Sequence, residues 1–249
     1  MIGKASPARA RLISLLAFVL FIGYAACKPS SATTIPGPRF NIAGVGVSAQ
    51  FSQEYVNICA GNGVYLAVWQ DRRSNVDYDI YGILLDSNGS PIVAESFLIS
   101  KMAGGTPAPN DQWYPAVGFN GTDFLVAWSD RRAANQIPRI YAARVTTSGQ
   151  VLDQGGIAFP TAPTPTEQFV PQIASNGVTW QVVWQEKNSM GNDDIYGAQV
   201  SASGVVGSRV AIAFRADNES WPSIAWNGSN YLVVWQDYRN SESTGTDIY

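Results

Sequence analysis

The sequence contains no histidine. Histidine is the commonest general base in enzymes and a frequent zinc ligand, so its absence removes Ser-His and Cys-His nucleophile pairs and the usual zinc centres. Other catalytic signatures are missing too: there is no G-x-S-x-G, no P-loop and no G-x-G-x-x-G. We therefore favour a function without catalysis, and we expect no cofactor and no bound metal.

The sequence has only two cysteines, Cys27 and Cys59. Cys27 follows a run of fifteen mostly apolar residues at 12–26. Three positive charges precede this run, at Lys4, Arg9 and Arg11. A membrane-spanning helix needs about 20 apolar residues, so the run is short for a span and typical of a secretory signal peptide. Cys59 is then left alone, and we expect it to be an unpaired, buried small side chain.

The residues around Cys27 resemble a bacterial lipobox. Ala25 and Ala26 are small, as that motif requires, while Tyr24 stands where leucine is usual. The resemblance implies that residues 1–26 are a signal peptide, that Cys27 carries the lipid (palmitate), and that residues 27–38 form a tether. The chain would then be exported and lipid-anchored in the cell envelope, at the outer membrane or cell surface. An ordinary signal peptide cut near Ala26 and an uncleaved anchor are the alternatives.

Charged residues are scarce, at 14% of the chain. Without the three cations of the signal peptide, 13 Lys and Arg face 19 Asp and Glu, a net charge of −6. An acidic domain is a poor partner for nucleic acid. We therefore expect an envelope protein or a polysaccharide as the partner, and no nucleic acid.

The remaining sequence is organised by a repeat. A tryptophan that ends an apolar stretch recurs after 59, 56 and 51 residues, at Trp69, Trp128, Trp184 and Trp235. Each unit predicts four short strands, the first two joined by an Asn-Gly turn of type I′. The apolar stretch does not alternate with polar residues, which predicts burial on both faces. Four strands every 50 to 60 residues are typical of a β-propeller blade.

We therefore predict an all-β fold, a β-propeller of at least four repeats, over residues 39–249. The units lie near 52–100, 111–159, 167–214 and 219–249. Residues 39–44 look like a strand ahead of the first unit. Because Tyr249 falls early in the third strand of its unit, we expect an incomplete ring. Another stacked β array is the alternative.

The repeat words also carry a family resemblance. Pro-x-hydrophobic-small-x-Asn-Gly, an apolar strand, Asp-x-Arg and Asp-Ile-Tyr follow one another over residues 52–249. This order resembles the TolB-like (WD40-like) propeller repeats of bacterial envelope proteins. The usual Trp-Ser-Pro-Asp-Gly of that family is absent from these units. The resemblance implies a propeller fold and an envelope location, and it implies no specific partner.

The charged stretch "VWQDRRSNVDYDIYG" at residues 68–82 invites a catalytic or calcium-binding interpretation. Asp71 and Arg73 recur in units two and four, and Asp79 recurs in units three and four. A feature repeated in most blades favours a structural role: the carboxylate caps turn amides and the arginine pairs across the hairpin. The recurring tryptophans are likewise expected in the core.

The places where units depart from the repeat, and the aromatic residues before each first strand, are the candidate site. In a four-stranded blade, the hairpin between strands two and three and the connection to the next blade share one face. That face is expected to carry the aromatic residues Tyr55, Trp113, Tyr114, Phe169 and Trp221. Our candidate ligand-binding residues are Trp113, Tyr114, Trp221, Arg72, Arg131, Arg139, Glu186 and Lys187.

Arginine and aromatic groups together suit the binding of proteins or glycans. The preferred hypothesis is a lipid-anchored envelope propeller that acts as a binding or scaffold module for protein or polysaccharide. A glycan-cleaving propeller enzyme is the first alternative, because some such enzymes take carboxylates from separate blades. A purely structural envelope lipoprotein is the second.

Overall fold

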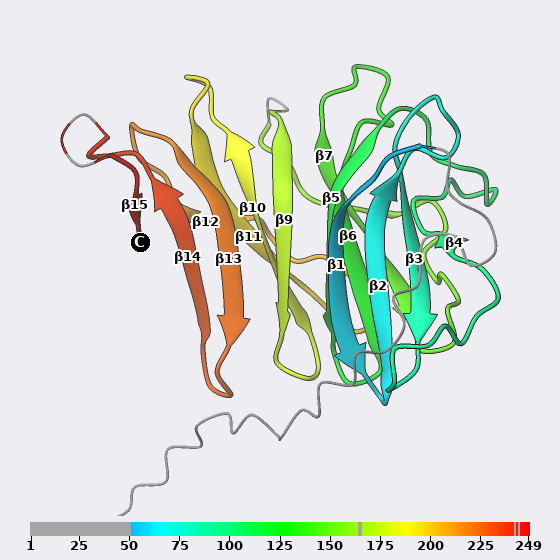
Figure 1. Ribbon diagram of the computed structural model, residues 1–249. Helices are drawn as coiled ribbons and strands as arrows, with labels where there is room; N and C mark the ends of the chain where they lie inside the picture. Colours follow the sequence, from blue (N-terminus) through cyan, green and yellow to red (C-terminus); the bar gives the residue numbers. More distant parts are fainter. Residues whose placement is uncertain (1–50, 164–165, 242, 244) are drawn as a thin grey trace, which may run out of the picture. The chain divides into compact units, whose positions relative to one another are not determined.

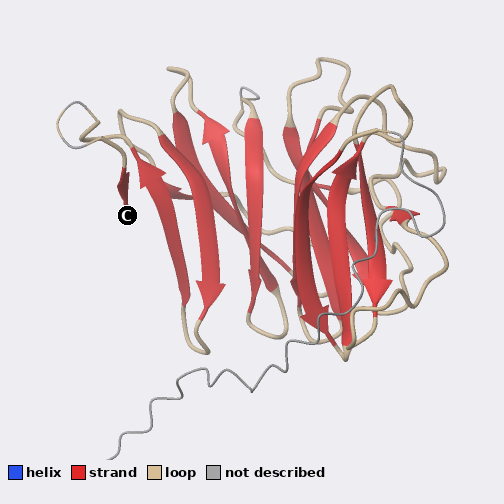
Figure 2. Ribbon diagram, viewed as in Figure 1, coloured by secondary structure: helices blue, strands red, loops and turns tan. Residues whose placement is uncertain are grey.

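The computed structural model describes residues 51–249 except 164–165, 242 and 244, and the regular elements of this part are β-strands (Figure 2). The predicted signal peptide, Cys27 and the strand expected at 39–44 lie outside the described residues. In the described range, no helix is long and apolar enough to cross a membrane. The strands are β1 (Gln53–Gly61), β2 (Val64–Asp71), β3 (Asp79–Leu85), β4 (Phe97–Leu98), β5 (Gln112–Phe119), β6 (Asp123–Asp130), β7 (Arg139–Thr146), β8 (Ile157–Ala158), β9 (Gln168–Ser175), β10 (Trp180–Lys187), β11 (Asp193–Val200), β12 (Val210–Ala213), β13 (Glu219–Trp226), β14 (Tyr231–Asp237) and β15 (Asp247–Ile248).

These strands form four antiparallel sheets that follow one another along the chain (Figure 1). Three sheets have four strands, in the orders β1-β2-β3-β4, β5-β6-β7-β8 and β9-β10-β11-β12, and the last is β13-β14-β15. The first strands contact one another in series, β1 with β5, β5 with β9 and β9 with β13. This is the arrangement of propeller blades, with the first strand innermost. The predicted β-propeller is confirmed, and we number its blades 1 to 4.

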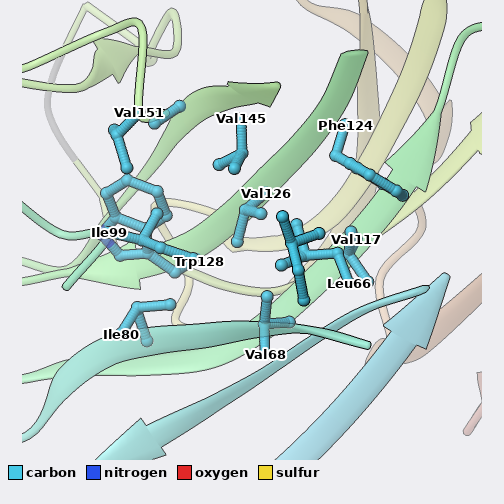
Figure 3. Close-up of a cluster of buried hydrophobic side chains, with 12 residues drawn as sticks. Leu66, Val68, Ile80, Ile99, Val117, Phe124, Val126, Trp128, Val145 and Val151 are labelled. Atoms are coloured by element: carbon cyan, nitrogen blue, oxygen red, sulfur yellow. The ribbon is translucent and has the colours of Figure 1, made fainter. Parts of the chain in front are cut away.

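The apolar second strands hold neighbouring blades together. On β2, Leu66 and Val68 join a buried cluster that includes Trp128 of β6 (Figure 3). Ala67 and Trp69, which alternate with them along the strand, belong to a second cluster. Because successive side chains of a strand point to opposite faces, β2 is buried on both faces, as its sequence predicts.

The recurring tryptophans follow the prediction, whereas Cys59, which was expected to be buried, is only partly buried. Trp69, Trp128 and Trp184 are at most 2% exposed, which confirms their core role, while Trp235 of blade 4 is half-buried. Cys59 is free and packs at the edge of the first cluster. Burial raises the pKa of its thiol, so the side chain stays neutral.

The charged hairpin motif fixes the end of each second strand. In blade 1, the Asp71 carboxylate accepts hydrogen bonds from the Trp69 indole (2.8 Å), the Arg73 amide (2.8 Å) and the Arg73 guanidinium (2.6 Å). Arg73 also covers the Tyr81 ring, 3.7 Å from its centroid. The predicted capping by aspartate is confirmed. The arginine pairs with the aspartate two residues before it, which corrects the expected pairing across the hairpin. The same four-residue arrangement recurs in blade 2 (Trp128, Asp130, Arg132, Tyr141) and blade 4 (Trp235, Asp237, Arg239, Tyr249).

Blade 3 builds this arrangement from different residues. Glu186 replaces the aspartate, and Asn188 replaces the arginine. Arg209, the residue before β12, supplies the missing cation: its Nε donates to Glu186 Oε2 at 3.0 Å, and its guanidinium lies 3.6 Å from the Tyr196 ring centroid. The Trp184 indole also donates to Glu186 at 3.0 Å. The apparent departure of blade 3 therefore preserves the geometry of the motif.

Only the first Asn-Gly pair forms the predicted type I′ turn. Asn62 and Gly63 both have positive φ, 48° and 79°. In the later blades the pair lies one position earlier in the loop, and positive φ falls on the glycine alone. There the asparagine caps the loop instead: Asn120 Oδ1 accepts from the amides of Thr122 and Asp123. The first two strands of the blades are thus joined by two different turns.

Candidate functional site

Each innermost strand is interrupted near its start by a β-bulge. The register of β1 against β2 shifts between Glu54 and Asn57, and β5, β9 and β13 shift at the same place. At each bulge one residue has a left-handed backbone, with φ between 51° and 55°: Tyr55, Tyr114, Val170 and Trp221. This conformation costs of order 1–3 kcal/mol for such residues. Bulges re-aim side chains and are frequent beside binding sites.

The four bulge residues line one cavity where the blades meet. Its volume is about 260 Å³, and it contains the rings of Tyr55, Tyr114 and Trp221. The ring centroids of Tyr55 and Tyr114 lie 4.8 Å apart, and those of Tyr114 and Trp221 lie 6.4 Å apart, both in edge-to-face geometry. Tyr55 is 53% and Trp221 is 50% exposed, so ligand can reach both rings. We call this space the axial cavity.

Glutamines of the second strands hold two of the bulges in place. Gln70 Oε1 of β2 accepts a hydrogen bond from the Tyr114 amide at 3.2 Å, and Gln185 Oε1 of β10 accepts from the Trp221 amide at 3.1 Å. Each bond crosses from one blade to the next. In blade 2 the equivalent position is Ser129, whose hydroxyl has no hydrogen-bond partner among the described residues. Tyr114 and Trp221 are therefore better supported than Val170.

Three of the predicted residues lie outside the lining of the axial cavity and form pairs of a cation with an aromatic ring. Trp113 stands next to Tyr114, and the Arg131 guanidinium covers its ring at 5.3 Å. Arg72 lies 5.8 Å from the ring centroid of Tyr78. Each pair combines a cation with a flat ring.

The other predicted residues lie apart from the axial cavity. Glu186 is fully buried inside blade 3, where its carboxylate serves the hairpin motif. Lys187 pairs with Asp193 at 3.4 Å. Arg139 lines a separate cavity in the hairpin of blade 2. The structure thus brings Tyr114 and Trp221 together and distributes the remaining candidates over three blades.

The sequence does not predict the β-bulges. Left-handed positions usually carry glycine, but here they carry two tyrosines, a valine and a tryptophan. The sequence therefore does not predict Val170 as a ligand-binding residue. It predicts both Trp113 and Tyr114, but only Tyr114 lines the cavity. One signal was present: Tyr114, Val170 and Trp221 each directly precede a proline.

The axial cavity offers flat rings and amides rather than charge. Its lining residues, within the described ranges, include the amides Asn57 and Gln172 and no carboxylate or cation. Burial and the neighbouring Tyr55 raise the pKa of Tyr114, so this phenol stays protonated at neutral pH. Such a surface can stack on a ring and exchange hydrogen bonds with hydroxyl groups.

Comparisons with known proteins place the fold. No protein-family model matches the sequence, and no curated protein matches it. A thermostable family-43 glycoside hydrolase is 12% identical with a TM-score of 0.51, over 79% of this chain and 70% of that chain. A neuraminidase-like protein of a flat-faced bat isolate is 10% identical with a TM-score of 0.52, over 76% of this chain and 47% of that chain. An endo-arabinase from Bacteroides thetaiotaomicron is 12% identical with a TM-score of 0.47, over 79% of this chain and 74% of that chain.

These similarities concern the fold. At 10–12% identity they confirm a β-propeller, the part of the TolB-like resemblance that is borne out. The two with TM-scores above 0.5 are a glycoside hydrolase and a neuraminidase-like protein, and neither is TolB-like.

Proposed function

We propose that the chain recognises a glycan in the axial cavity. The observation that carries this proposal is the set of four bulges, which hold the rings of Tyr55, Tyr114 and Trp221 at one place. Backbone strain at four equivalent positions is maintained only where surrounding structure enforces it, and it clusters at ligand sites. At three of the strained positions the side chain is an aromatic ring that lines the cavity, and this coincidence supports a role for the rings.

Sugars suit the chemistry of this cavity. One face of a sugar ring presents C–H groups that pack on an aromatic face, while its hydroxyls exchange hydrogen bonds with amides and phenols. The volume of about 260 Å³ lies just below the roughly 300–1,000 Å³ of sites for drug-sized ligands. A single ring of a longer polysaccharide would fill it. The name of one similar structure, a glycoside hydrolase, supports the same ligand class.

Removing the axial rings is expected to abolish glycan binding while leaving the fold intact. We expect the double variant Tyr114→Ala, Trp221→Ala to bind at least tenfold more weakly to whichever polysaccharide the wild type retains. Each exposed ring loses its stacking contact, and alanine still fits the bulge. The measurement is affinity electrophoresis against arabinan and a panel of plant and bacterial polysaccharides, with circular dichroism to monitor folding.

Phe214→Ala is the matched control, because Phe214 is 67% exposed and lies outside the axial cavity. It should bind as the wild type does. A folded double variant with unchanged affinity would overturn the axial assignment.

Glycan cleavage is the second candidate, and the name of one similar structure, a glycoside hydrolase, favours it. Glycosidases use two carboxyl groups roughly 5–10 Å apart. Glu54 directly precedes Tyr55 on β1, and its carboxylate accepts hydrogen bonds from Tyr78 Oη (3.2 Å) and Gln70 Nε2 (3.3 Å). It is exposed, so it can meet a substrate held by Tyr55.

If the chain cleaves glycans, the wild type releases reducing ends from arabinan or a related polymer. Glu54→Gln is then expected to lower that rate roughly 100-fold or more, while binding to the axial rings persists. Glu95→Gln, at another exposed glutamate, is the control and should keep full activity. Release of no sugar by the wild type would leave binding as the function, and full activity of Glu54→Gln would exclude Glu54 as a catalytic residue.

A further inference from the structure

Blade 2 departs from its neighbours at the residue that closes the charged hairpin. In blades 1, 3 and 4 the paired positions at the strand ends are both acidic: Asp71 with Asp79, Glu186 with Asp194, and Asp237 with Asp247. In blade 2, Asp130 is paired with Arg139. The hairpin of blade 2 therefore carries a cation where the other three blades carry a carboxylate.

This cation is not used within the blade. Asp130, its neighbour across the strands, already accepts hydrogen bonds from the Trp128 indole (2.6 Å) and from the amide (2.8 Å) and guanidinium (2.6 Å) of Arg132. In the described part of the chain, no hydrogen bond or ion pair reaches the Arg139 guanidinium, and its Nε is buried without a partner. An external oxyanion cannot reach the buried Nε, but it can meet the terminal amino groups of this half-buried side chain and compensate its charge.

Arg139 opens into a cavity of about 380 Å³. The cavity is lined by Ala133, Ala134 and Asn135 of the hairpin together with Arg139 and Tyr141 of β7. The two alanines leave the space open, Asn135 adds an amide, and Tyr141 adds a phenol. Arg131 and Arg132 belong to the same hairpin, so its field favours an anion.

A series of contacts and sequence neighbours links this cavity to the axial one. Tyr114 lines the axial cavity, and the adjacent Trp113 lies under Arg131. Arg131 Nε in turn donates to the Gln136 carbonyl at 2.9 Å, next to Asn135 of the hairpin cavity. Aromatic and cationic groups thus follow one another over blade 2, which is a suitable track for a polymer.

We propose that Arg139 binds an oxyanion of an acidic glycan, the carboxylate of a uronic acid, while a neighbouring sugar ring occupies the axial cavity. This assignment rests on the proposed function and names its ligand class. The planar guanidinium can meet a carboxylate through two parallel hydrogen bonds. A sulfate or phosphate ion has the same chemistry, and the experiment separates these sources.

The test compares an oligogalacturonate, its carboxyl-reduced neutral counterpart and sodium sulfate by calorimetry at low and moderate salt. We expect the wild type to bind the acidic oligosaccharide at least tenfold more tightly than the neutral one, with the difference shrinking as salt increases. Arg139→Gln should remove this preference and leave neutral binding unchanged. Arg139→Asp, which installs the residue of the other blades, should fold normally and also remove it. Arg215→Gln, at an exposed arginine outside the cavity, should keep it.

The outcomes separate this inference from the proposed function. If Arg139→Gln keeps the acidic preference while the axial variant loses neutral binding, the inference fails and the function stands. If the wild type binds neither oligosaccharide, the inference fails, and the polysaccharide panel decides the proposed function separately. If sulfate alone binds at Arg139 and the acidic oligosaccharide gains nothing from it, the site holds an adventitious ion only, and the inference is overturned.

Discussion

Replacing Arg209 by methionine is expected to lower the free energy of unfolding by about 3 kcal/mol. Arg209 is the cation of the blade 3 motif, and its partner Glu186 has a side chain with 0% exposure. Removing one member of a buried pair leaves an uncompensated charge, which typically costs about 3–5 kcal/mol. The lower end applies because the Arg209 side chain is 23% exposed. Methionine retains apolar contact with the Tyr196 ring, so the loss reports mainly on charge.

Chemical denaturation of the wild type and the variant measures this difference. Arg215→Met, at an exposed arginine, is the control and should change stability by less than about 0.5 kcal/mol. Adding Glu186→Gln to Arg209→Met should recover most of the loss, because an amide needs no cation. Together with the single variant Glu186→Gln, these measurements give the coupling energy between the two residues. A loss below about 1 kcal/mol in the single variant would show that the two charges do not depend on each other.

The role of Arg209 in blade 3 could not be predicted from the sequence. Recurrence predicts the blades, the buried tryptophans and the capping by Asp71, because each repeats at a fixed spacing. It also directs attention to Glu186 and Asn188 as departures from the repeat. The compensating cation lies 23 residues after Glu186, in another segment of the blade. No local pattern links such residues, since the contact exists only after β11 and β12 have paired.

The lining of the axial cavity could be predicted from the sequence only in part. The repeat predicts where the first strand of each unit begins, and it predicts aromatic residues on that face. It does not predict the bulges, because they depend on register between strands and not on a residue type. A shift of one residue decides that Tyr114 lines the cavity and that Trp113 lies under Arg131. The direction of a side chain near a bulge can therefore be known only once the pairing of the two strands is known.

Asp79 is expected to make the protein less stable as the pH rises from about 4 to about 7. Burial, with repulsion from Asp77, raises the pKa of Asp79 to about 7, while the Ser100 hydroxyl, 3.2 Å away, acts in the opposite direction. In the unfolded chain the pKa is near its ordinary value of about 4. Between these values the folded state holds the extra proton, so deprotonation favours unfolding. A shift of about 3 units corresponds to at most about 4 kcal/mol.

Asp79→Asn should remove this penalty, since the amide is neutral and its carbonyl still accepts from Ser100. We expect the variant to exceed the wild type by about 2–4 kcal/mol at pH 8 and to lose that advantage near pH 4, as measured by denaturation across this range. Taking the difference between the two proteins removes the opposite slope of Asp237, whose pKa its neighbour Arg239 lowers to about 2. Asp217→Asn, at an exposed aspartate, should give a flat difference. A flat difference for Asp79→Asn would mean that its carboxyl is ionised in the folded blade at neutral pH without penalty. The proton on Asp79 would then have no part in closing the hairpin of blade 1.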